Sequence, residues 1–203
     1  MRKTHKELLE VLTQYPIATP SLELRQVAKR DALELARFFN SDRGDFQQHI
    51  PDLPEGDKIE FGPALSKMAL EQIEKKDREE QAVHLFVADK RHGRHFLGVV
   101  RVWQDGEDRP RISPYLLPSL RGNGLLTELF EKVVGRVFAA GLLEGNILYA
   151  EAGVDDRAAM GFLMARHFRQ AGEPKPGEQR TFGDTRSLII PYERRLELPN
   201  KAL

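Results

Sequence analysis

A glycine-rich turn followed at once by an amphipathic helix constrains this chain more than any other feature. The turn consists of Arg121, Gly122, Asn123 and Gly124, and it comes after a predicted strand over residues 111–117. The helix behind it carries apolar residues at the spacing of one continuous helical face: Leu125, Leu126, Leu129, Phe130, Val133, Val134, Val137 and Phe138. Gly141 is expected to end the helix in a left-handed conformation. Backbone N–H groups at the start of such a helix form a site for an anion, most often a phosphate.

The residues after the last glycine distinguish between the known types of phosphate-binding loop. A Walker loop requires Lys and then Ser or Thr, and Leu125 and Leu126 stand there instead. A dinucleotide-binding fold requires a third glycine, and position 127 is Thr. The turn resembles the coenzyme A loop of the GNAT N-acetyltransferases, with Leu126 in place of that loop's final small residue. A tight glycine turn without a ligand is the alternative.

The rest of the chain resembles the same family, with its segments in the same order over residues 19–196. The closest branch is that of the Rim-type ribosomal-protein N-terminal acetyltransferases. Arg166, His167 and Phe168 stand where the family's last helix usually ends in Leu-Gly-Phe. The segments that carry the resemblance are 21–25 and 31–34 (first strand and helix), 84–89 and 96–101 (central hairpin), 112–118 (cofactor-binding strand), 155–159 and 166–169 (last helix) and 184–190 (closing strand).

Strands alternate with helices along the chain, which predicts a mixed α/β sheet covered by helices. The resemblance implies the GNAT fold, with helices on both faces of a central mixed sheet. A length of 203 residues favours one domain. We expect a helical extension over 1–18, the N-acetyltransferase domain over 19–196 and a short tail over 197–203. The extension is expected to pack on the domain surface, and a homodimer contact is its alternative role. Residues 64–76 predict a further helix, followed by a solvated charge run over 75–80.

The resemblance also implies how a coenzyme would be held. In the GNAT fold two adjacent parallel strands, here 111–117 and 146–154, splay apart and leave backbone groups for the pantetheine arm. The diphosphate of acetyl-CoA is expected on the glycine turn, and a backbone donor near Leu116 faces the thioester oxygen. Asp156 replaces a family Asn and is expected to cap the last helix. The expected cofactor-binding residues are Leu116, Leu117, Arg121, Gly122, Asn123, Gly124, Leu125, Leu126, Thr127 and Asp156.

Proton transfer departs from the family's pattern. Leu163 stands where many GNAT enzymes have a Tyr general acid, and Ala159 stands where some Rim-type enzymes have a Ser. Glu178, counted from Gly172, stands at the position of the Rim-type general base, and a solvated loop carboxylate is the alternative reading of it. The reserve candidates on the two cofactor strands are Ser113, Tyr115, Tyr149 and Glu151.

Composition excludes several classes of function. Lys+Arg and Asp+Glu both number 31, and this balance argues against a surface built to bind nucleic acid or an anionic membrane. The absence of cysteine excludes thiol catalysis and cysteine-ligated zinc. His92 and His95 lack further ligands, so no metal is expected. No apolar run reaches the ~20 residues of a membrane span, and we expect a cytoplasmic protein.

We therefore expect an acetyl-CoA-dependent N-acetyltransferase whose acceptor is an amine. The Rim-type resemblance implies the N-terminal α-amine of a protein, and a polyamine, an amino acid or an aminoglycoside are the alternatives. Because both usual acids are missing, a coenzyme A-binding module that has lost catalysis is a second hypothesis. A structural partner protein that uses the N-terminal helix is a third.

Overall fold

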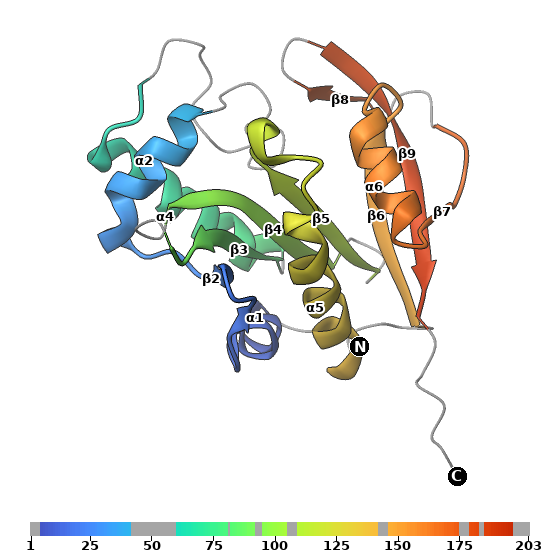
Figure 1. The fold of residues 1–203 in the computed structure, drawn as a ribbon, viewed down its shortest axis with the longest axis horizontal. Helices are drawn as coiled ribbons and strands as arrows, with labels where there is room; N and C mark the ends of the chain where they lie inside the picture. Colours follow the sequence, from blue (N-terminus) through green and yellow to red (C-terminus); the bar gives the residue numbers. More distant parts are fainter. Residues whose placement is uncertain are drawn as a thin grey trace.

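The structure is a computed structural model that describes residues 5–41, 60–80, 82–91, 95–104, 109–141, 146–174, 179–182 and 185–196. Its helices and strands are interspersed along the chain (Figure 1). The helices are α1 (His5–Thr13), α2 (Ala32–Ser41), α4 (Pro63–Glu80), α5 (Leu125–Ala139) and α6 (Arg157–Ala165), with short 3-10 turns η1 (Lys29–Asp31) and η2 (Pro118–Leu120). The strands are β1 (Ile17–Ala18), β2 (Leu22–Arg25), β3 (Ala82–Asp89), β4 (Phe96–Gln104), β5 (Pro110–Leu116), β6 (Ile147–Gly153), β7 (Arg169–Gln170), β8 (Gln179–Phe182) and β9 (Thr185–Arg195).

The strands form one mixed sheet in the order β1-β2-β3-β4-β5-β6-β9-β7, and β8 pairs with β9 off this path. Neighbouring strands are antiparallel except β5 and β6, which are parallel. Parallel neighbours require a crossover connection, and α5 provides it here. The single parallel pair therefore consists of the strand before the glycine turn, β5, and the strand after α5, β6.

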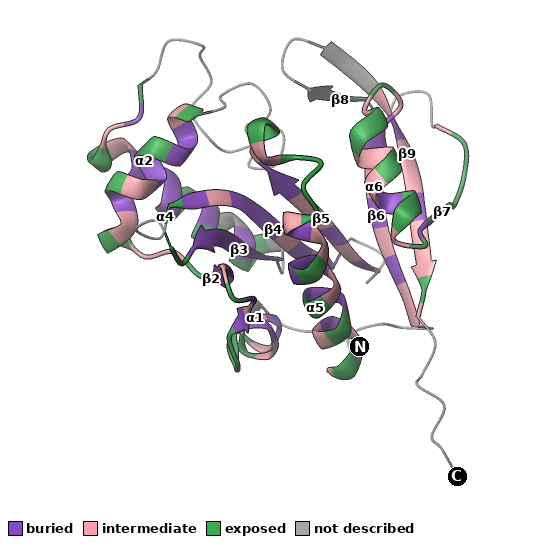
Figure 2. Ribbon diagram, in the orientation of Figure 1, coloured by how far each residue is buried: buried purple, intermediate pink, exposed green. Residues whose placement is uncertain are grey.

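Helices cover both faces of the sheet, as predicted. On one face α1 and α5 pack against a core that includes Leu129, Phe130 and Val133. On the other face α2 and α4 enclose a second core that includes Phe38 and Phe86. Every residue of β3 is buried between these two layers (Figure 2). The predicted mixed α/β class with helices on both faces is confirmed.

The helix expected over residues 64–76 is longer than its apolar pattern indicated. α4 continues through the charge run to Glu80, so the predicted end of the helix was too early, whereas Lys75, Arg78 and Glu79 of the run are exposed as expected. Asp77, inside that run, is only 5% exposed. Its Oδ1 lies 2.8 Å from Nδ1 of His84, and its Oδ2 accepts the His84 backbone N–H at 3.1 Å. This contact with the start of β3 buries a charge that the local pattern places in solvent.

The N-terminal helix packs into the main core. Leu8 and Leu12 of α1 are each 2% exposed and belong to the same cluster as the buried face of α5. Lys132 Nζ donates to the Ala18 carbonyl at 2.7 Å, and Arg136 donates to the Leu12 carbonyl at 3.2 Å. These bonds hold the last turn of α1 and strand β1 against α5. None of the described helices combines the length and the apolar composition needed to cross a bilayer.

Candidate coenzyme site

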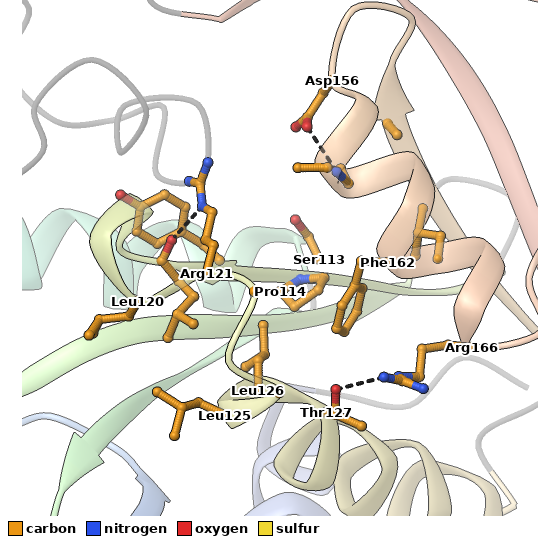
Figure 3. Close-up of a pocket in the computed structure, with 18 of the residues that line it drawn as sticks. Ser113, Pro114, Leu120, Arg121, Leu125, Leu126, Thr127, Asp156, Phe162 and Arg166 are labelled. Carbon is orange, nitrogen blue, oxygen red and sulfur yellow. Dashed lines mark hydrogen bonds between the residues drawn. The ribbon is translucent and has the colours of Figure 1, made fainter.

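A pocket of about 490 Å³ lies where β5, β6, α5 and α6 meet (Figure 3). Its volume falls in the ordinary range of small-molecule sites. The glycine turn and the first turn of α5 form one wall, and one side of α6 forms the opposite wall. The lining residues are Ser113, Pro114, Tyr115, Leu116, Leu120, Arg121, Gly122, Gly124, Leu125, Leu126, Thr127, Glu151, Ala152, Gly153, Asp156, Ala158, Ala159, Phe162, Leu163 and Arg166.

The pocket exists because β5 and β6 separate soon after they meet. In the described strands they pair at one position, Arg111 with Tyr149, and then diverge (Figure 1). The predicted splay of these two strands is therefore present. Arg111 and Glu151 form an ion pair across the strands near this position, and both side chains are largely buried. The ion pair ties the strands together where their separation begins.

The peptide groups of β5 face the opening in a defined order. The Leu117 N–H donates to the Leu97 carbonyl at 2.9 Å, and hydrogen-bonded and open positions alternate along an antiparallel ladder. Leu116, opposite Gly98 in β4, therefore turns its peptide N–H and carbonyl towards β6. Pro114 is turned the same way and has no N–H to leave unpaired, which suits a strand edge.

The peptide groups of β6 face the opening from the other side. The Leu196 N–H donates to the Asn146 carbonyl at 2.8 Å, which fixes the hydrogen-bonded positions between β6 and β9. By the same alternation, Glu151 and Gly153 turn their peptide groups towards β5. Two strand edges thus face each other across the pocket, and their peptide groups are placed to bind an extended ligand between them.

The glycine turn leaves the start of α5 without a side-chain cap. Gly122 and Gly124 have φ of 82° and 70°, a left-handed conformation that glycine adopts at little cost. Gly124 is the N-cap of α5, and no side chain accepts from the first helical turn. Nothing lies within 4 Å of the place a Cβ would take at either glycine. An oxyanion can therefore approach the backbone N–H groups at this end of the helix, where the helix dipole favours negative charge.

Arg121 is directed towards the end of β5. Its Nε donates to the Leu116 carbonyl at 2.9 Å, and its guanidinium lies 5.5 Å from the centre of the Tyr115 ring. In Figure 3 Arg121 and Arg166 lie on opposite sides of the pocket. Arg121 therefore occupies the carbonyl of Leu116 and leaves that residue's N–H on the pocket side.

Asp156 caps α6, as predicted. Its Oδ1 accepts the Ala159 backbone N–H at 2.8 Å, and its own N–H donates to the Gly153 carbonyl at 3.0 Å. Within α6 the pocket wall includes Ala159 and the buried Leu163, both apolar. The positions at which the family carries Tyr or Ser acids thus contribute a methyl and an isobutyl group to the wall.

The pocket contains most of the predicted site residues: Leu116, Arg121, Gly122, Gly124, Leu125, Leu126, Thr127 and Asp156. Leu117 and Asn123 lie outside its lining, because Leu117 bonds back to β4 and packs against the second core, whereas Asn123 is exposed at the turn. Glu178 lies outside the described residues, so its role as a base stays a prediction. Among the reserve candidates, Ser113, Tyr115 and Glu151 line the pocket and Tyr149 does not.

Several lining residues were not among the predicted site residues, and two of them carry larger side chains on the α6 side. Phe162 and Arg166 lie one turn apart on α6 and face the pocket from the same side (Figure 3). The sequence could have indicated them, because Phe162 and Arg166 each follow Ala159 or Leu163 by three or four residues. This spacing places all four residues on one side of a helix. Among the described residues, no group of three or more His, Cys, Asp or Glu side chains is placed to hold a metal ion.

Comparison with known proteins gives a family and a fold. The family model described as "Acetyltransferase (GNAT) domain" matches residues 21–169. The ribosomal-protein-S5-alanine acetyltransferase from Vibrio fischeri has 17% identity and a TM-score of 0.67, covering 89% of this chain and 96% of that one. An acetyltransferase from Salmonella typhimurium that modifies the N-terminal serine of the 50S subunit protein L7/L12 has 16% identity and a TM-score of 0.68, covering 90% and 100%.

The microcin C7 self-immunity acetyltransferase MccE, solved in complex with acetyl-CoA and AMP, has 18% identity and a TM-score of 0.66, covering 88% of this chain and 94% of that one. At such identities the likeness shows the fold alone, and the predicted GNAT fold is confirmed. A comparison of the sequence with curated proteins found no match.

Proposed function

Because this chain belongs to the GNAT family of acetyl-CoA-dependent acetyltransferases, we propose that the pocket between β5 and β6 is its acetyl-CoA site and that the acceptor is the N-terminal α-amine of a protein. One observation carries the proposal: two open strand edges lead to an uncapped helix N-terminus inside one pocket. A thioester bound there supplies an activated acetyl group. The residues present fit such a ligand at its diphosphate, its amide-bearing arm and its thioester.

Each part of the pocket has a separate task. The N–H groups of the glycine turn and of the first turn of α5 bind the diphosphate. The peptide group of Glu151 and the N–H of Gly153 bind the pantetheine amides as a neighbouring strand would, since the Gly153 carbonyl already accepts the Asp156 N–H. The Leu116 N–H, turned to the pocket, donates to the thioester oxygen as negative charge develops on it. Apolar Phe162 and Leu163 exclude water from the arm.

Proton transfer rests on Glu178 in this proposal. The nine residues of α6 include no Tyr, Ser or Cys, so this helix supplies no acid, and in this proposal the leaving thiolate departs unprotonated or takes a proton from water. Removing the proton of the acceptor amine is then the step that a carboxylate assists. Glu151 is a less suitable base because it is held in an ion pair with Arg111.

The protein acceptor is supported by the resemblance of the chain to the Rim-type enzymes. Similar structures carry names that specify N-terminal or ribosomal-protein acetylation, among them the two acetyltransferases from Vibrio fischeri and Salmonella typhimurium. A peptide panel tests this, with Ser, Ala, Met and other first residues and with free-thiol release as the readout. Each peptide has a matched control whose α-amine is already acetylated. We expect thiol release from free peptides only. Release with polyamines, amino acids or aminoglycosides and with no peptide would contradict the protein acceptor.

Ligand binding and the Glu178→Gln variant separate an enzyme from an inactive module. Acetyl-CoA at ~100 times its Kd should stabilise the fold by about 2.7 kcal/mol, which thermal unfolding measures. Glu178→Gln should lower kcat by roughly 100-fold while leaving acetyl-CoA affinity unchanged. The matched control is Glu173→Gln, which alters an exposed carboxylate five residues earlier. No binding would reject the coenzyme site, and binding without turnover would favour the module.

A further inference from the structure

Arg166 brings a cation to the end of the pocket at which α6 meets the first turn of α5. It is the C-cap of α6, and its Nη2 donates to Oγ1 of Thr127 at 2.7 Å (Figure 3). Its Nη1 donates to the Ala165 carbonyl at 3.1 Å, and its guanidinium lies 5.6 Å from the centre of the Phe162 ring. The side chain is therefore held in place by neutral groups on three sides.

The charge of Arg166 is not balanced by a carboxylate in the part of the chain that the structure describes. Two other partly buried arginines do have carboxylate partners, Arg25 with Asp31 and Arg194 with Glu131, whereas Arg136 bonds to the Leu12 carbonyl and lies away from the pocket. The Nε of Arg166 is itself buried and has no hydrogen-bond partner among the described residues. The guanidinium lines the pocket without a carboxylate partner, and such a group is suited to an oxyanion, which it binds in a forked geometry.

The position along α5 indicates which oxyanion this is. Thr127 lies three residues after Gly124, so Arg166 is anchored roughly 4.5 Å further along the helix axis than the turn assigned to the diphosphate. Asp156, at the other end of α6, lies beside Gly153 and marks the end taken by the pantetheine arm. The nucleotide part of the ligand must therefore leave the pocket on the Arg166 side.

Resting on the acetyl-CoA site proposed above, we propose that Arg166 binds the 3′-phosphate of coenzyme A and makes the protein select coenzyme A over 3′-dephospho-coenzyme A. A phosphomonoester carries about two negative charges at neutral pH and presents three acceptor oxygens. The diphosphate is common to both ligands and is bound by backbone N–H groups, so it provides no discrimination between them. Arg166 supplies the charged donor that binds the additional phosphate.

The test is calorimetric titration of the full chain with coenzyme A and with 3′-dephospho-coenzyme A. A hydrogen bond to a charged group corresponds to about 10- to 100-fold in affinity, and we expect the wild type to prefer coenzyme A by that factor. Arg166→Met should reduce the preference to within about 3-fold by weakening coenzyme A alone, leaving dephospho-coenzyme A within about 2-fold. Arg166→Lys should retain part of the preference.

Two controls keep the result specific. Arg169→Met removes an exposed positive charge three residues away and should leave the preference intact. Thr127→Val removes the hydroxyl that orients Arg166 and should lower the preference less than Arg166→Met does, with unfolding temperatures measured for all variants. Equal losses for both ligands in Arg166→Met would show that Arg166 serves the diphosphate or the packing of α6, and an unchanged preference would also overturn the assignment. A wild type that binds neither ligand would instead reject the coenzyme site itself.

Discussion

Gly124 and Gly141 have nearly the same backbone conformation at opposite ends of α5, with φ of 70° and 65°. No atom lies within 4 Å of a Cβ built on either residue. Alanine at either position should therefore cost the same left-handed strain, about 1–2 kcal/mol of unfolding free energy. Only the Gly124→Ala methyl group projects into the proposed diphosphate site, so that variant alone should lose coenzyme A affinity, by ~10-fold or more. Denaturant unfolding and calorimetry check the two effects, and equal affinity of both variants would remove the turn from the site.

Two substitutions of Asp156 distinguish its role as the N-cap of α6 from the effect of its negative charge. Asp156→Ala should lose about 1 kcal/mol of stability because the Ala159 N–H loses its acceptor. Asp156→Asn keeps an acceptor oxygen and should stay within a few tenths of a kcal/mol of the wild type. The Asn variant also removes a negative charge from a pocket proposed to hold three phosphates, so its coenzyme A affinity should be equal or higher. A marked loss of affinity in Asp156→Asn would indicate that the carboxylate itself contacts the ligand.

Individual side-chain directions were the least predictable part of the site. The sequence places Arg121 in the phosphate turn, but its Nε bonds to the Leu116 carbonyl five residues earlier, because η2 folds the chain back on β5. Arg166 is the reverse case, because the sequence did not predict it as a site residue. Local sequence gives it no partner, and only the packing of α6 against α5 brings it to Thr127. Long side chains reach groups that are fixed by tertiary structure, which spacing along the chain does not encode.

At the scale of elements, the strand-turn-helix unit followed from the sequence because its information is local. The apolar period of α5, its glycine N-cap and Gly141 at its end all lie within one segment. The splay was predicted only through the resemblance, although Pro114 carried a physical signal, since a proline inside a strand marks an unpaired edge. The full length of α4 was missed because the contact between Asp77 and His84 joins two elements.

Gly98 of β4 is expected to set the position of the end of β5. A Cβ at this residue would lie 2.3 Å from the Tyr115 carbonyl oxygen and 3.2 Å from the Leu116 Cα, both backbone atoms. Gly98→Ala should therefore displace the β5 backbone, cost about 1–3 kcal/mol of stability and weaken coenzyme A binding through the shift of Leu116. Gly135→Ala should instead stabilise the protein. Gly135 is exposed within α5 and has free space around it, so alanine should raise the free energy of unfolding by nearly 1 kcal/mol. Thermal unfolding and calorimetry on both variants check this, and an unchanged Gly98→Ala protein would contradict it.

At the scale of the whole molecule, the order of strands and helices was enough to predict the class of fold. Alternating elements with a single strand-helix-strand crossover leave few arrangements for the sheet. The placement of α1 was harder to predict because its partners are distant in sequence. The Lys132 ammonium and the Ala18 carbonyl are 114 residues apart, and the arginine that bonds to the Leu12 carbonyl is 124 residues away.

We propose that α1 and the rest of the chain form one folding unit, because Leu8 is 2% exposed within the same core as α5. Leu8→Ala should then destabilise the whole protein by about 2–5 kcal/mol, the range for removing a large buried apolar side chain. Glu10→Ala, on the exposed side of the same helix, should change stability by less than about 0.5 kcal/mol. Trp103, the single tryptophan, reports on β4, while circular dichroism reports on all helices. In denaturant, the two probes should give coincident transitions that Leu8→Ala shifts together. A Trp103 transition that does not move would show that the N-terminal helix folds apart from the sheet.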